Sequence, residues 1–263
     1  MGGTKMKLKK LSAVLVLASF ALSACARTPA ERDKQMARNA EILAEMGLPT
    51  FKSGIQIVPR SQLGMPDEIL KEGKEEAKQR EALGYAEKNV PYVAELLAMK
   101  KTAPHEIKLM ASNQNDGTTH MRKSVHDLKL AFKFPGTEQS RMLSYDGRMN
   151  TLGAAPKGSY NKDKGWSGAA QFFSYKDIGV CSYAVMNVKA SGTAAMLAME
   201  DVTYDINNKA TLTKVDGSTN SGFLYKIEWF DDNNFHELEC ASSQYSKQIN
   251  HDVIELARTT DKL

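Results

Sequence analysis

The chain of 263 residues lacks the short motifs that identify the common hydrolase and nucleotide-binding classes. HExxH, G-x-S-x-G, G-x-G-x-x-G and P-loop patterns are all absent, so nothing indicates a zinc hydrolase, a serine hydrolase or a nucleotide site. Internal repeats and low-complexity segments are absent as well, which gives no indication of a repeat array or a disordered chain. Function must therefore be inferred from targeting signals and overall organisation.

An excess of charge of either sign is also missing from most of the chain. The sequence has 35 basic and 31 acidic residues, but four of the lysines lie in residues 1–24, which contain no acid. The remaining 239 residues carry 31 charges of each sign and are formally neutral. A neutral body lacks the basic footprint of a nucleic-acid-binding protein, so we expect no nucleic-acid partner.

The hydrophobic run in residues 11–22 is too short for a membrane-spanning helix, which needs about 20 apolar residues. Four lysines precede this run, and the small residues Ser23 and Ala24 follow it. A basic start, a short apolar region and small residues at the end are typical of an export signal. The pattern predicts a signal peptide over residues 1–24.

The residues Leu22-Ser23-Ala24-Cys25 resemble the bacterial lipobox, in which the cysteine is acylated and becomes the new N-terminus. The resemblance implies a lipid anchor at Cys25, and the alternative is an ordinary secretory signal followed by a chance cysteine. Position 26 is alanine rather than the aspartate that retains lipoproteins in the inner membrane. We therefore expect a protein anchored in the bacterial outer membrane through its lipid and facing the periplasm.

Cysteine is scarce, with three in the whole chain. With Cys25 assigned to the lipid, Cys181 and Cys240 remain as a pair in an oxidising compartment, which favours a disulfide. Two buried free thiols or half of a metal site are the alternatives. His105-Glu106 and His236-Glu237 lack the second histidine of a zinc motif, so we expect neither a metal nor a cofactor.

Hydrophobic periodicity predicts an α+β protein with a helical N-terminal third, an antiparallel β-sheet and a C-terminal amphipathic helix. We expect a signal peptide (1–24), a lipid-anchored helical tether region (25–104) and an antiparallel β-rich domain with a closing helix (105–263). Predicted helices cover residues 28–46, 66–84, 90–101 and 247–259, and residues 50–64 form an extended connector.

Alternating patterns predict strands over residues 105–112, 127–134 and 178–188, and two more around Asn207-Asn208. Residues 222–242 give the clearest hairpin. A turn at Asp231–Asn234 would place Trp229 opposite His236 and Ile227 opposite Leu238, with an unfavourable Glu228–Glu237 pair on the other face. Residues 135–168, rich in glycine and polar residues, are expected to form a long surface loop.

One segment of that loop, residues 156–168, combines cations with aromatic side chains, and such a set suits sugar faces, anionic headgroups or a protein partner. In the alternative interpretation the tryptophan turns inward and the lysines are solvated. Ser159 and Lys162 also match S-x-x-K, but the SDN and KTG motifs that accompany it in penicillin-binding enzymes are absent. The candidate binding residues are Lys157, Tyr160, Lys162, Lys164 and Trp166.

Together these features predict a non-catalytic outer-membrane lipoprotein that is a structural subunit of an envelope-spanning assembly. Its layout resembles the accessory lipoproteins of secretion-system outer-membrane cores, such as those of type IV systems, which implies other envelope proteins as partners. A monomeric periplasmic module that binds a cell-wall or small ligand is the alternative, followed by a cell-wall-modifying enzyme.

Overall fold

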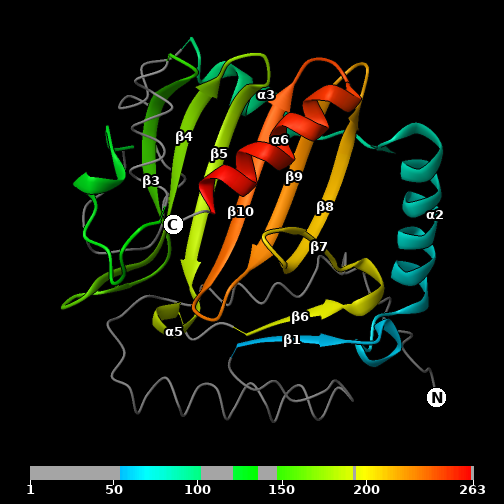
Figure 1. The fold of residues 1–263 in the computed structure, drawn as a ribbon, viewed down its shortest axis with the longest axis horizontal. Coiled ribbons are helices and arrows are strands. Elements are labelled where there is room, and N and C mark those ends of the chain that lie inside the picture. The colour runs from blue at the N-terminus through cyan, green and yellow to red at the C-terminus, as the bar shows by residue number, and fades with distance from the viewer. Residues whose placement is uncertain (1–53, 102–120, 136–146, 192–193, 262–263) are drawn as a thin grey trace, which may run out of the picture.

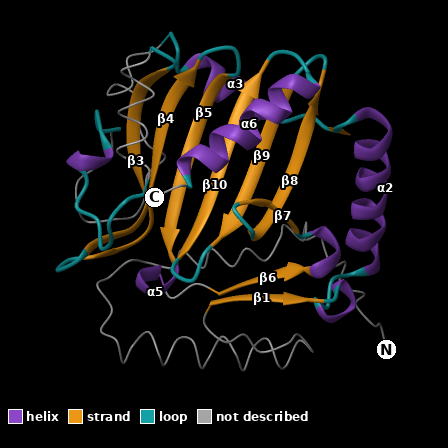
Figure 2. Cartoon of the chain, in the orientation of Figure 1, coloured by secondary structure: helices purple, strands orange, loops and turns teal. Residues whose placement is uncertain are grey.

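The computed structural model describes residues 54–101, 121–135, 147–191 and 194–261. Cys25, the predicted helix 28–46 and the predicted strand 105–112 lie outside these ranges. The described part combines helices with one large sheet, which confirms the α+β class (Figure 2).

An eight-stranded sheet forms the centre of the protein (Figure 1). Neighbouring strands are antiparallel, except that β2 runs parallel to β8. In spatial order the strands are β2 (Ala86–Glu87), β8 (Lys209–Ser218), β9 (Gly222–Phe230), β10 (Asn234–Ser242), β5 (Gly179–Asn187), β4 (Gly165–Tyr175) and β3 (Met149–Asn161), and β7 (Thr203–Ile206) pairs with β8 outside this path.

The β9–β10 hairpin has the predicted register. Trp229 pairs with His236, Ile227 with Leu238 and Glu228 with Glu237. Asp231 explains the turn, because its carboxylate accepts the amides of Asn233 and Asn234 at 2.8 and 2.7 Å. The predicted strands on either side of Asn207-Asn208 are confirmed as β7 and β8, and both asparagines have the positive φ of a tight hairpin turn.

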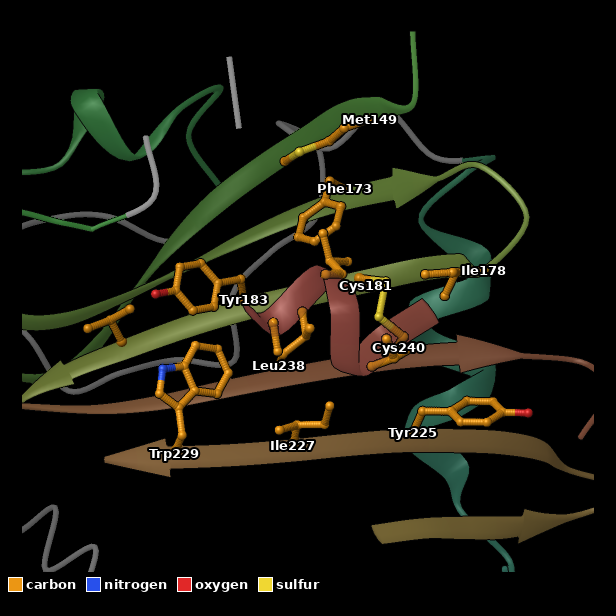
Figure 3. Close-up of a cluster of buried hydrophobic side chains, with 14 of the residues drawn as sticks. Met149, Phe173, Ile178, Cys181, Tyr183, Tyr225, Ile227, Trp229, Leu238 and Cys240 are labelled. Atoms are coloured by element: carbon orange, nitrogen blue, oxygen red, sulfur yellow. A yellow bond between two sulfur atoms is a disulfide. The ribbon is translucent and has the colours of Figure 1, made fainter. Parts of the chain in front are cut away.

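Helices pack on both faces of the sheet. Helix α6 (Lys247–Thr260) is the predicted amphipathic helix, and it begins where the Ser246 hydroxyl accepts the amides of Gln248 and Ile249. Its Val253 and Leu256 join the main hydrophobic core, part of which Figure 3 shows. Helix α3 (Pro91–Ala98) lies on the opposite face, where a second hydrophobic cluster forms around its buried Val93 and Leu96.

The predicted surface loop over residues 135–168 is wrong for its second half, because strand β3 and the first residues of β4 lie there. The residues of β4 from Gly165 to Phe173 are all buried, so this central strand does not alternate between polar and apolar residues. Its small residues are required by close packing. A Cβ added at Gly168 would lie 2.8 Å from the carbonyl oxygen of Val185.

The predicted strand over residues 127–134 is also wrong. The short 3₁₀ helix η3 (Val125–Asp127) precedes it, capped by reciprocal bonds between Ser124 and Asp127, and Leu130 forms an isolated bridge to Trp166. Even so, Leu128 and Phe134 are buried in the main core. The alternation therefore identified the buried side chains correctly but not the backbone conformation.

Other elements lie at the edge of the sheet or away from it (Figure 1). Strands β1 (Gly54–Val58) and β6 (Ala194–Ala198) form a separate two-stranded sheet, called here the β1–β6 ribbon. The predicted helix near residues 66–84 is confirmed as α2 (Asp67–Leu83), which stands beside the β2 and β8 edge. Short helical turns complete the set: η1 (Arg60–Gln62), α5 (Val188–Ser191) and η4 (Met199–Asp201).

Candidate functional site

The two predicted cysteines form a disulfide in the centre of the sheet (Figure 3). Cys181 on β5 and Cys240 on β10 are directly opposite in the register, on the face covered by α6, and both are fully buried. The bond therefore joins neighbouring strands within the hydrophobic core. In the described ranges, no group of three or more His, Cys, Asp or Glu side chains is arranged to hold a metal ion.

The five residues of the predicted binding loop do not form one exposed surface. Trp166 is 2 % exposed, and its backbone bonds to Lys129 and Ala131 of a neighbouring segment. Tyr160 packs on it, with ring centroids 5.1 Å apart. The tryptophan thus turns inward, as in the alternative interpretation, and it cannot stack on a ligand in solution without a change of structure.

The three lysines of that segment do not lie together either. Lys162 and Lys164 are exposed at the turn between β3 and β4. Lys157 points elsewhere, because its ammonium lies 2.6 Å from the Glu237 carboxylate on β10. Strand β4 has Gly168 at the register position opposite Lys157, so no β4 side chain at that position obstructs this reach.

Glu237 belongs to a buried group of charges on the α3 side of the sheet, called here the Lys226 cluster. The ammonium of Lys226 lies 3.0 Å from Glu228, 2.5 Å from Glu237 and 3.3 Å from Glu239. Side chains in this cluster are 11 to 15 % exposed. The predicted repulsion between Glu228 and Glu237 is therefore offset by Lys226, which lies two residues from Glu228 on the same strand. A comparison of directly facing residues alone does not reveal this contact.

Charge and burial give two carboxylates of the Lys226 cluster, Glu237 and Glu239, different pKa values. Burial alone would raise the pKa of Glu237, but the nearby Lys157 and Lys226 lower it to about 2. Burial and the charge of Glu237 raise the pKa of Glu239. Carboxyl groups with separated pKa values can serve acid–base chemistry when a substrate reaches them. Here they are nearly buried, and their contacts join β3, β9 and β10.

We expect the free energy of unfolding to fall as the pH drops from 4.5 towards 2, where Glu237 gains a proton that the folded state binds weakly. A pKa lowered by folding stabilises the protein above the unfolded-state value, and this contribution is lost on acidification. Glu237→Gln should destabilise the protein at pH 7 by roughly 2 kcal/mol and flatten the acid limb, as measured by urea unfolding. Glu255→Gln, at an exposed pair with Arg258, is the control. Equal acid slopes in the two variants would contradict this role of Glu237.

A second buried network links the turn of the β9–β10 hairpin to the core. The Tyr183 hydroxyl lies 2.9 Å from Nδ1 of His236, and Nε2 of His236 lies 2.8 Å from Asp231. In the neutral ring Nε2 donates to the carboxylate, and Nδ1 accepts from tyrosine. An acid–histidine–hydroxyl chain activates nucleophiles in hydrolases, where the hydroxyl meets substrate. Tyr183 is instead 2 % exposed and stacked on Trp229, and burial raises its pKa, so the hydroxyl stays protonated.

Helix α2 is attached to the body by polar contacts and at its C-terminal end. None of its 17 residues is buried. Arg80 pairs with Asp216 of β8 at 2.5 Å and with Glu76 at 3.1 Å. Gly84 ends the helix in the left-handed conformation, and the next residue, Tyr85, packs its ring against Phe223 and Tyr245. Most of the helix surface is therefore exposed to solvent.

The β1–β6 ribbon joins segments about 140 residues apart. Its five register pairs run in parallel, from Gly54–Ala194 to Val58–Ala198. Just beyond it, the Arg60 amide donates to the Glu200 carboxylate at 2.9 Å, and the Arg60 guanidinium pairs with Asp201. Beyond the end of β6 along the chain, the apolar side chains of Met199 and Tyr204 are 56 and 59 % exposed. A pairing between segments so distant leaves no local signal in the sequence.

These features describe an α+β protein with a buried disulfide and buried polar networks, with helix α2 and the β1–β6 ribbon attached outside the central sheet. No family model, curated protein or solved structure matches the chain. Among the described helices, none is both long and apolar enough to cross a membrane.

Proposed function

We propose that the chain is a non-catalytic lipoprotein of the bacterial outer membrane, anchored through Cys25, whose folded body is a structural subunit of an envelope-spanning assembly. The outer-membrane core of a type IV-like secretion system is the kind of assembly that its layout resembles. Its partners are then the membrane lipid and neighbouring envelope proteins.

The main support for this proposal is the exposure of helix α2. A helix normally gains most of its stability by packing an apolar face, yet α2 has no buried residue over 17 positions. It is held beside the sheet by Arg80 and by the end of the helix. An exposed helix at the edge of the sheet offers a surface for contact with a neighbouring subunit.

The burial and internal bonding of the ionisable groups with displaced pKa values support a role without catalysis. Glu237, Lys226 and Tyr183 have pKa values displaced from their ordinary range, which is a common property of catalytic groups. All three are nearly buried and bonded to one another or to other protein groups. The displaced pKa values are thus explained by internal contacts.

Gentle detergent extraction of the native envelope, capture through a C-terminal tag and sizing test the proposal. We expect a large particle of defined composition that contains other envelope proteins. A monomer that survives the mildest extraction without partners would overturn it.

A charge-reversed α2 gives a sharper test. Glu68→Lys/Glu72→Lys changes two exposed carboxylates of α2, and Asp163→Lys/Asp232→Lys makes the same charge change at two exposed turns. Both variants should keep the free energy of unfolding within about 0.5 kcal/mol of the wild type. We expect the α2 variant to recover about tenfold less of the large particle, and the control to recover it normally. Equal recovery would show that α2 is not the contact surface.

A further inference from the structure

An open groove of about 440 Å³ lies at one end of the sheet, on the side of α3. It is bounded by the turn between β4 and β5, the start of β3, the end of β10 and the residues that follow α3. Leu97, Ile178 and Ala241 supply the apolar part of its lining. The groove is distinct from the Lys226 cluster and from α2, because it shares no residue with them.

Positive charge is concentrated around this groove. The charged residues that line it are Lys100, Arg148, Lys176 and one acid, Asp177. The three cations come from separate segments of the chain. The backbone amide of Lys176 donates to the carbonyl oxygen of Arg148 at 2.8 Å, so these two basic residues lie on neighbouring segments.

Neither Lys100 nor Lys176 forms an ion pair within the described part of the chain. This contrasts with Lys157, Lys209 and Lys226, which are all paired with carboxylates. The chain after residue 24 is neutral, so a generally basic composition does not account for the concentration of charge.

The other polar groups of the groove are suited to an anion. Ser174, Ser242 and Ser243 line it together with Asn150, and hydroxyl and amide groups can donate to oxyanions. Arginine adds planar, bidentate donors and lysine adds point charges, which is the combination common at phosphate sites. The volume lies within the range of small-molecule sites, and it accommodates a phosphate group with part of the molecule that carries it.

We propose that this groove binds a phosphate-bearing ligand, with Lys100, Arg148 and Lys176 as the groups that recognise the anion. The phosphate belongs either to a membrane lipid headgroup or to a soluble phosphate compound. The site does not depend on the assembly role proposed above, because it requires no partner protein.

The test uses the purified full-length mature chain and two probes: inorganic pyrophosphate, by titration calorimetry, and vesicles of phosphatidylcholine and phosphatidylglycerol in equal parts, by co-sedimentation. For vesicles the chain carries Cys25→Ala, so that an acyl anchor cannot contribute. Lys100→Gln/Arg148→Gln/Lys176→Gln removes the three cations. Lys123→Gln/Lys133→Gln/Lys189→Gln removes the same charge from exposed positions outside the groove and is the matched control.

We expect the groove variant to lose at least about tenfold in affinity, since one charge-assisted hydrogen bond accounts for about that factor. The control should stay within about twofold of the wild type, and binding should weaken with added salt. Binding of pyrophosphate identifies a soluble phosphate, and binding of vesicles alone identifies a lipid headgroup. Equal losses in the two variants, or no binding of either probe by the wild type, would overturn the proposal.

Discussion

Replacing Cys25 with alanine should remove the protein from the outer membrane and abolish its labelling by palmitate. The thiol is the group that accepts the lipid in the lipobox that Leu22-Ser23-Ala24-Cys25 resembles, and alanine offers no acceptor. Several buried acyl chains hold a protein far more firmly than surface contacts do, at about 0.8 kcal/mol per buried CH₂. Labelling with palmitate and separation of the inner and outer membranes on a density gradient measure both effects.

The Ala26→Asp variant is the control for this experiment. It keeps the acceptor thiol, so labelling should persist, while aspartate after the cysteine should move the protein to the inner membrane. A Cys25→Ala protein that stays in the outer membrane after a high-salt wash would show that the anchor lies elsewhere.

The second large effect concerns the disulfide. The double variant Cys181→Ala/Cys240→Ala should lose about 2 to 4 kcal/mol of unfolding free energy, measured by urea denaturation. The bond closes a loop with a sequence separation of 59 residues, so its loss frees the unfolded chain, and truncation of two buried side chains adds to the cost.

Wild-type protein that is unfolded, reduced and refolded in reductant separates these two contributions, because it loses the bond but keeps both side chains. It should lie between the double variant and the oxidised protein in stability. Because both sulfur atoms are buried, the native protein should react with reductant much more slowly than the unfolded chain. An unchanged urea midpoint after removal of the bond would contradict its stabilising role.

The parts of the fold that the sequence predicts well are those determined by local patterns. Residues 222–242 alternate strongly around a short turn at Asp231, and the hairpin register follows from the turn. The disulfide is expected from the number of cysteines, and the separate pairing of β10 with β5 places Cys240 opposite Cys181. Helix α6 follows from its 3.6-residue periodicity and from Ser246 at its start.

The missed parts depend on contacts between distant segments. Strand β4 is buried on both faces and built largely of small residues, so its composition resembles that of a loop. The reach of Lys157 to Glu237 depends on the position of β3 relative to β10, and the triad of Tyr183, His236 and Asp231 spans two neighbouring strands and a turn. The basic groove combines residues from several separate segments, none of which has a recognisable motif.

The parallel direction of the β1–β6 ribbon determines how tension on the N-terminal side would act on the protein. A pull applied before Gly54 acts at one end of the ladder, whereas β6 continues from its other end, Ala198, towards β7 and the main sheet. Force along this path shears the ladder, so its hydrogen bonds must break together rather than peel apart in turn. The contacts of Arg60 with Glu200 and Asp201 oppose the same sliding movement. Among the described elements, the ribbon is therefore the first that a pull applied before Gly54 would load, and α2 and the disulfide-linked sheet follow it along the chain.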